Sequence, residues 1–201
     1  MDFNHIGIFD KLRERIVWNF LRSPYNRGFA HSLGLKGSEK VLEFGSGSGA
    51  VSRHIAALLS CGGSLVCVDT SKGLMDIARR RLGSYPNVKQ LEGDLKSHHL
   101  KSGSFDMVAV HFVLHDVPGT DRKPLVMELA RLLVPGGLLI IREPTRLGHG
   151  MPPQEIQSLM RSSGLKEVSS STGRRMGWVP YFSGNYLKTG KGVRSIRRRR
   201  D

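Results

Sequence analysis

Apolar residues occur along most of the chain in short runs that alternate with helically spaced segments. Runs at 41–44, 65–68, 88–92, 106–111 and 138–142 predict strands. The spacing between them predicts helices at 50–59, 73–82 and 121–133, with a last helix at 153–163 ended by Gly164. Such alternation predicts an α/β sandwich with a mainly parallel sheet and right-handed crossovers.

Both ends of the chain depart from this alternation. Residues 1–36 form a predicted N-terminal helical lid, with apolar positions at helical spacing before residue 21 and a second short helix at 25–33. Near the other end, residues 165–168 and 178–187 are strand-like with no helix between them, which predicts a hairpin and one antiparallel strand. We therefore divide the chain into the lid, a binding domain at 37–187 and a tail at 188–201.

Charge singles out the tail. The chain has 31 Lys and Arg against 17 Asp and Glu, a formal net charge of +14. Residues 188–201 hold seven of the basic residues and one acid, so we expect a disordered tail. Such a tail either solubilises the protein or makes weak, non-specific contact with nucleic acid or an anionic membrane. No stable protein partner is predicted.

Composition indicates a cytoplasmic protein. Two cysteines, Cys61 and Cys67, are too few for a disulfide framework. The first residues lack the order of a signal peptide, and no apolar run approaches the length of a membrane span.

Three alternate glycines, Gly45, Gly47 and Gly49, lie in the predicted turn between the first strand and its helix. Ligands of parallel sheets bind at such turns, where a missing side chain lets a flat molecule approach the backbone. Two ligand classes use such a turn, namely dinucleotides and ligands that carry an ammonium group. The stretch matches the dinucleotide pattern through Ala50, but that match alone is weak.

Carboxylates around the turn narrow the choice of ligand. Glu43, two residues before the first glycine, would repel a pyrophosphate and suit an ammonium group. Asp69 ends the second strand, where it can accept hydrogen bonds from ribose hydroxyls, in either ligand class. Asp94 follows the third strand and can face an adenine amino group.

The stretches "VLEFGSGSG", "VDTSKGLMDIARRRL", "EGDL", "FDMVAVHFVLHDV" and "LARLLVPGGLLII" appear in this order between residues 40 and 142. In this order and spacing, the chain resembles a class I S-adenosylmethionine-dependent methyltransferase of the type that methylates quinones and other small molecules. The resemblance implies a Rossmann-like three-layer sandwich, a seven-stranded sheet with the last strand antiparallel, and S-adenosylmethionine as cofactor.

The resemblance also implies roles for individual residues. The three glycines would pass under the methionine part of the cofactor, and Glu43 would hold its ammonium group through water. The remaining implied contacts are Asp69 with the ribose, Thr70, Met75, Asp94 and the Leu95 amide with the adenine, and His111 with the methionyl group. Met75 is equally a candidate core residue, and His111 a candidate structural histidine. Tyr25 is a further candidate, either for the cofactor carboxylate or for packing.

The sulfonium methyl is already activated, so the protein must mainly align the reactants and exclude water. A phenol or alcohol acceptor also needs a base, for which His115 and Asp116 are our candidates, alongside His111 and Glu143. Asp116 has the alternative role of capping the following segment. Because His111 falls on a strand and His115 in a loop, we expect no metal site there.

Three functions remain open at this point. The first is methyl transfer to a small or lipid-like acceptor. The second is methylation of RNA or protein, with the basic surface used for docking. The third is a non-catalytic cofactor-binding protein, which the intact glycines, Asp69 and Asp94 disfavour. A dinucleotide enzyme is a more distant alternative.

Overall fold

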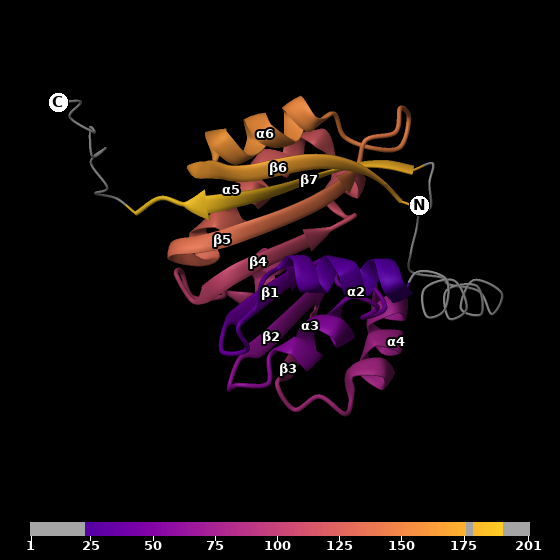
Figure 1. Ribbon diagram of the computed structural model, residues 1–201. Coiled ribbons are helices and arrows are strands. Elements are labelled where there is room, and N and C mark those ends of the chain that lie inside the picture. The colour runs from indigo at the N-terminus through magenta and orange to yellow at the C-terminus, as the bar shows by residue number, and fades with distance from the viewer. Residues whose placement is uncertain (1–22, 176–178, 191–201) are drawn as a thin grey trace.

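The predicted strands assemble into a seven-stranded sheet in the order β3-β2-β1-β4-β5-β7-β6, with helices on both faces (Figure 1). The structure, a computed structural model, describes residues 23–175 and 179–190. The strands are β1 (Lys40–Phe44), β2 (Ser64–Asp69), β3 (Val88–Glu92), β4 (Phe105–His111), β5 (Leu133–Pro144), β6 (Leu165–Arg175) and β7 (Val179–Lys188). The helices are α2 (Ser23–Ser32), α3 (Ser52–Leu58), α4 (Lys72–Leu82), α5 (Gly119–Leu132) and α6 (Pro153–Ser162), with short 3-10 turns η2 (Leu95–His98) and η3 (Leu114–Asp116).

The pairing of the strands confirms the predicted Rossmann-like three-layer fold. β1 pairs in parallel with both β2 and β4, so the chain order reverses at β1, where parallel sheets bind ligands. β7 lies between β5 and β6 and is antiparallel to both, which confirms one antiparallel strand near the C-terminal end.

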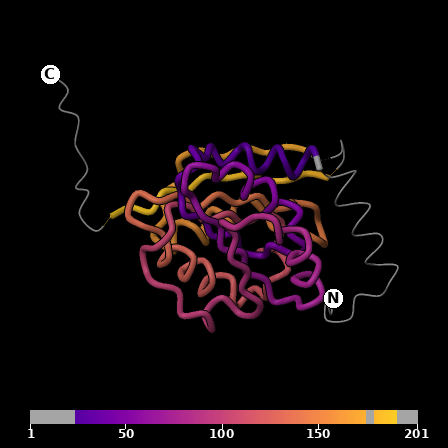
Figure 2. The backbone as a smooth tube through the Cα atoms, turned by 90° about the horizontal axis from the view of Figure 1, so that it is seen from below, coloured from indigo at the N-terminus to yellow at the C-terminus, as the bar shows by residue number. Residues whose placement is uncertain are grey.

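Alternate residues of the central strands belong to two hydrophobic layers, one on each face of the sheet. On β1, Val41 packs in the layer under α2, α3 and α4, whereas Leu42 packs in the layer under α5 and α6. Figure 2 views the sheet from below and shows α2, in indigo, on one side of it. No helix within residues 23–175 and 179–190 combines the length and the apolar character that a membrane span requires.

Two predicted strands are longer than expected. β5 begins at Leu133, not at residue 138, because Leu133 already pairs with Phe105 of β4, and the Pro-Gly-Gly segment lies in the irregularity between this pair and the next, Met107 with Leu138. β6 continues to Arg175, not to residue 168, because its serine-rich run pairs with β7 throughout. The apolar pattern did not predict the extension of β6, because its exposed serines are polar.

The remaining expectations concern the two ends of the chain, where the structure describes only some of the residues. The second N-terminal helix is confirmed as α2, and β7 includes Lys188, which we assigned to the tail. The helical pattern before residue 21, residue 178 and most of the tail, 191–201, lie outside the described residues.

The glycine turn after β1 is shaped by packing as well as by any ligand. A Cβ built on Gly45 would lie 2.3 Å from Val113, and one on Gly49 would lie 3.1 Å from Leu82. At Gly47 the nearest atom, on Leu74, is 3.9 Å away. All three glycines have positive φ, so the backbone itself also disfavours a side chain. Of the three positions, Gly47 alone leaves open space for a ligand.

We predict that Gly45→Ala destabilises the protein by about 3 kcal/mol, through its left-handed backbone and the clash with Val113. Gly148→Ala is the matched control, because Gly148 also has positive φ but no neighbour within 4 Å. That control should cost about 1 kcal/mol. Urea unfolding measures both, and adding Val113→Ala should recover part of the loss at Gly45. Equal losses for the two single variants would refute the packing role.

Candidate functional site

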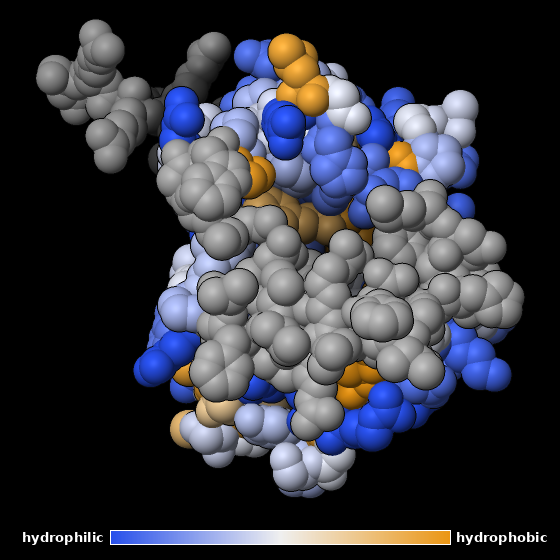
Figure 3. Space-filling model, turned by 90° about the vertical axis from the view of Figure 1, so that its right-hand side faces the viewer, coloured by the Kyte–Doolittle hydropathy of each residue, from blue (hydrophilic) through white to orange (hydrophobic). Residues whose placement is uncertain are grey.

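The parallel strands β1, β2, β3 and β4 end at one edge of the sheet, on the right-hand side of Figure 1. Backbone hydrogen bonds join the loops at this edge. The Gly45 amide donates to the Val68 carbonyl at 2.8 Å, and the Gly93 amide donates to the Asp69 carbonyl at 2.9 Å. Figure 3 shows this side of the molecule, where hydrophobic residues are visible in a recess below a largely polar surface.

Asp69 links the first two loops of the edge. One carboxylate oxygen accepts the Gly47 amide at 2.7 Å, and the other accepts the Ser71 amide at 2.8 Å. Burial raises the pKa of Asp69, and the two backbone hydrogen bonds partly offset this effect. Each oxygen keeps a second lone pair that can accept a hydroxyl hydrogen bond.

Glu43 lies beneath the turn and is 2% exposed. Burial raises its pKa to about 7, although the side chains of Ser52 and Cys67 close to it act in the opposite direction. The nearby charge of Asp69 raises the pKa further. Near neutral pH this carboxyl is therefore divided between its neutral and charged forms, and a cation placed close to it would favour the charged form.

The residues expected around an adenine differ in their exposure. Thr70 and Asp94 are exposed, and one Asp94 oxygen accepts the Lys96 amide at 2.8 Å. Leu95 is 2% exposed. Met75 is fully buried on the inner face of α4, with its sulfur 3.8 Å from the Ser46 hydroxyl. These positions fit the alternative of Met75 as a core residue, while its expected contact with adenine stays a prediction.

Helix α2 brings aromatic rings to the end of β4. The His111 ring centroid lies 4.4 Å from that of Phe29, 4.6 Å from that of Phe112 and 5.7 Å from that of Tyr25. His111 is 8% exposed, and Phe112 has a positive φ of 57° that is unusual for a bulky residue. Strain of this kind clusters at functional sites.

Arg142 completes this aromatic group from β5, beside His111 in the sheet. Its guanidinium carbon lies 4.9, 5.0 and 5.4 Å from the ring centroids of Tyr181, Phe29 and Tyr25, respectively. The residue is 9% exposed. A cation therefore lies under α2 at the same edge of the sheet as the glycine turn.

Glu143 organises the loop that follows β4. Its fully buried carboxylate accepts the backbone amides of Val113 at 3.0 Å and Leu114 at 2.7 Å, and lies 2.6 Å from Nδ1 of His115. The side chain of His115 is 7% exposed, and its Nε2 lies 3.5 Å from a carboxylate oxygen of Asp116. The two catalytic candidates are thus adjacent, but Glu143 is the closer partner of the imidazole.

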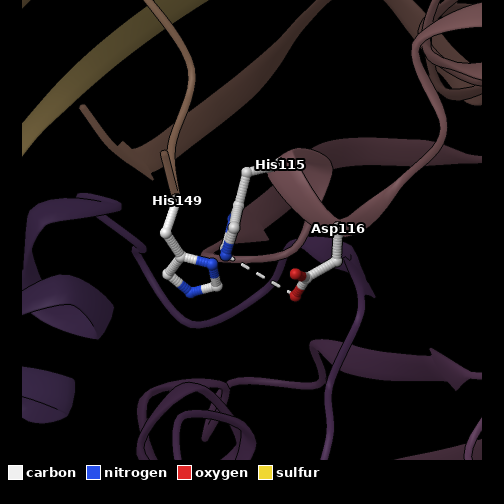
Figure 4. A group of neighbouring side chains, drawn as sticks. All are labelled: His115, Asp116 and His149. Carbon is white, nitrogen blue, oxygen red and sulfur yellow. Dashed lines mark ion pairs between the residues drawn. The ribbon is translucent and has the colours of Figure 1, made fainter. Parts of the chain in front are cut away.

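The pKa of His115 is raised. Burial acts to lower it, but the hydrogen bond and charge of Glu143, together with the charge of Asp116, outweigh that effect. His149, from the loop between β5 and α6, faces this imidazole with ring centroids 5.1 Å apart (Figure 4). Ligand atoms of His115, Asp116 and His149 lie within 4.8 Å of one another, so the three side chains could also hold a metal ion.

Reasoning from the sequence missed Arg142, Phe29 and His149 as members of this edge. Arg142 comes from β5, Phe29 from α2 and His149 from the loop between β5 and α6, and no sequence motif includes them. The arginine inside the apolar stretch of β5 was the one available signal, because a charge at a buried strand position requires a partner.

Comparison with known proteins finds matches to methyltransferases in sequence and in fold. A family profile described as a methyltransferase domain matches residues 42–141. Over 134 residues the chain is 31% identical to demethylmenaquinone methyltransferase of Tropheryma whipplei, covering 65% of this chain and 53% of that protein. The chain thus spans about half the length of this relative.

Solved structures share the fold. A SAM-dependent methyltransferase from Aquifex aeolicus has a TM-score of 0.64 at 20% identity, covering 89% of this chain and 96% of that chain. The [4+2]-cyclase SpnF has a TM-score of 0.70 at 14% identity, covering 83% and 80%, respectively. The methyltransferase profile, the named relative and the motifs between residues 40 and 142 show that the chain belongs to the class I methyltransferases, whose cofactor is S-adenosylmethionine, and the solved structures share its fold.

Proposed function

We propose that this protein transfers a methyl group from S-adenosylmethionine to a small or lipid-like acceptor. The observation that carries the proposal is the pair of carboxylates at the glycine turn, Glu43 below it and Asp69 bonded to the Gly47 amide. Glu43 at this point disfavours the pyrophosphate of a dinucleotide and suits a ligand with positive charge, while Asp69 suits the ribose hydroxyls that either ligand class carries.

The residues present fit this cofactor. Asp69 has acceptor capacity for the ribose, and the open space at Gly47 lies directly beside it. Within the described residues, the amide oxygen and nitrogen of Asn26 have no hydrogen-bond partner although the residue is fully buried on α2. A buried amide of this kind needs partners, and the polar methionine end of a bound cofactor can provide them. Tyr25, Thr70, Met75, Asp94, Leu95 and His111 keep their proposed roles around the same ligand.

Bound S-adenosylmethionine supplies an electrophilic methyl group on a sulfonium. The protein's own contribution to the chemistry centres on the imidazole of His115. With Nδ1–H donated to the buried Glu143 carboxylate, Nε2 is the nitrogen that can accept a proton from an acceptor hydroxyl. Glu143 then stabilises the imidazolium, and its hydrogen bonds to the Val113 and Leu114 amides fix the loop that carries the base.

The acceptor class rests on two observations. The relative from Tropheryma whipplei is named for a demethylated quinone, and aromatic side chains of α2 and β7 surround Arg142 near the end of β5. A flat ring bearing a hydroxyl, such as a phenol or quinol, fits both. The formal charge of +14 favours RNA or protein as the second candidate acceptor.

We predict that the purified protein forms S-adenosylhomocysteine from S-adenosylmethionine in the presence of phenols or quinols, and that His115→Gln lowers kcat about 100-fold or more. His99→Asn is the control, because His99 is exposed and asparagine tolerates its positive φ of 48°. Product formation with RNA or protein and with none of the small acceptors would refute the small-molecule assignment.

The same base predicts a pH profile. His115 acts in its neutral form, so kcat/KM should rise as the pH increases through its raised pKa. Glu143→Gln removes the charge that raises this pKa, so the acidic limb of the profile should move to lower pH while the maximal rate falls. An acidic limb that stays in place in Glu143→Gln would show that His115 is not the titrating base.

Glu43 predicts two linked effects of pH. Its pKa is raised from 4.5 to about 7, so the folded protein holds an extra proton between these values and its free energy of unfolding decreases as the pH rises through this window. Glu43→Gln should therefore be more stable than wild type above pH 7, by at most about 3 kcal/mol, and little changed at pH 4.

Binding of S-adenosylhomocysteine at pH 7 should also release protons, because its ammonium group favours the charged form of Glu43. Calorimetry in buffers of different ionisation enthalpy measures this release, which should disappear in Glu43→Gln. Equal proton release from the two proteins would contradict the role of Glu43.

A further inference from the structure

Arg142 is a buried cation with no anionic partner among residues 23–175 and 179–190. It is 9% exposed, its Nε has no hydrogen-bond partner, and none of the ion pairs in this part of the chain includes it. The nearest acid in sequence, Glu143, does not serve it. Successive residues of a strand point to opposite faces, and the Glu143 carboxylate already binds His115 and two backbone amides.

Aromatic rings surround the guanidinium in place of a carboxylate. Tyr25 and Phe29 come from α2 and Tyr181 from β7, each with its ring centroid within 5.4 Å of the guanidinium carbon. Ring faces attract a cation, but they do not take up the donors at the edge of the guanidinium plane. The arrangement therefore holds the charge in place and leaves hydrogen-bonding capacity unused at Nε.

A buried charge without a counter-ion destabilises a folded protein, and such groups are usually paired or exposed. An arginine here is best explained by an anion that is not among the groups of residues 23–175 and 179–190. Because Arg142 is paired with His111 at the end of β4, this anion would lie at the edge of the sheet from which the His115 loop begins.

We propose that Arg142 is the anion-binding group of the acceptor pocket, and that it binds a carboxylate on a flat aromatic acceptor. The guanidinium presents two parallel donors that match a carboxylate, and the rings of Tyr25 and Tyr181 offer stacking surfaces for the acceptor ring. This inference rests on the proposed function and narrows its acceptor class from phenols in general to aromatic acids.

Titration with benzoate and with benzamide, its neutral analogue of nearly the same shape, tests the proposal. Calorimetry or protein-observed NMR is run on the full chain, both alone and saturated with S-adenosylhomocysteine. In wild type, benzoate should bind at least tenfold more tightly than benzamide. Arg142→Met should abolish this preference, and Arg142→Lys should retain part of it. Arg80→Met is the control, because it removes an exposed arginine from α4 and should leave the preference intact.

Stability provides an independent measurement on the same variants. If Arg142 is kept for a ligand, Arg142→Met should fold and have a Tm equal to or higher than that of wild type, because methionine suits an apolar, aromatic site. A structural arginine would instead give a lower Tm when replaced.

A lower Tm of Arg142→Met and three results of the binding experiments would overturn the proposal. The binding results are a wild-type protein that binds benzoate no better than benzamide, a preference that survives Arg142→Met, and a tenfold loss of S-adenosylhomocysteine affinity in Arg142→Met. The last result would assign Arg142 to the cofactor carboxylate. Failure of wild type to bind S-adenosylhomocysteine would count against the proposed function alone, because the preference for benzoate is also measured without it.

Discussion

The Asp69 carboxylate holds the binding edge of this protein together. Through the amides of Gly47 and Ser71 it fixes the distance between the glycine turn and the start of α4, and its own carbonyl accepts the Gly93 amide from the third loop. A single residue at the end of β2 therefore sets the relative positions of three loops. Burial raises its pKa, and the two backbone hydrogen bonds act in the opposite direction by favouring the charged form.

Glu143 has the corresponding role for the loop that follows β4, at the same edge of the sheet. It is fully buried, yet it binds two consecutive amides and the imidazole of His115, so the β4 loop has a defined conformation. Glu43 and Arg142 contrast with these anchors, because each is a buried ionisable group with few compensating bonds. Residues that weaken the fold in this way are expected where a ligand completes the interactions.

Much of this arrangement could be predicted from the sequence. The strand–turn–helix units from β1 to β3 follow from local pattern, since apolar runs, glycines and terminal acids lie next to one another in the chain. Asp69 was therefore identified from its place at the end of a strand.

The length of β6 was not predicted, because its serine-rich run has no alternating apolar residues and forms a strand only by pairing with β7. Arg142, Phe29 and His149 were missed since their neighbours in space are distant in sequence. The packing of Val113 against Gly45 is a contact of the same kind, and it gives this glycine a reason beyond the sharp turn and the approach of a ligand.

The fold by itself does not decide the chemistry, as the similarity to the cyclase SpnF illustrates. The account depends instead on the proposal that the carboxylate-flanked turn binds an adenosyl cation. The most direct test is calorimetric titration of the full chain with S-adenosylhomocysteine and with NAD, for wild type and Asp69→Ala. We expect micromolar binding of S-adenosylhomocysteine by wild type, loss of that binding in Asp69→Ala, and no binding of NAD. Binding of NAD without S-adenosylhomocysteine, or equal affinity of the two proteins for S-adenosylhomocysteine, would contradict the account.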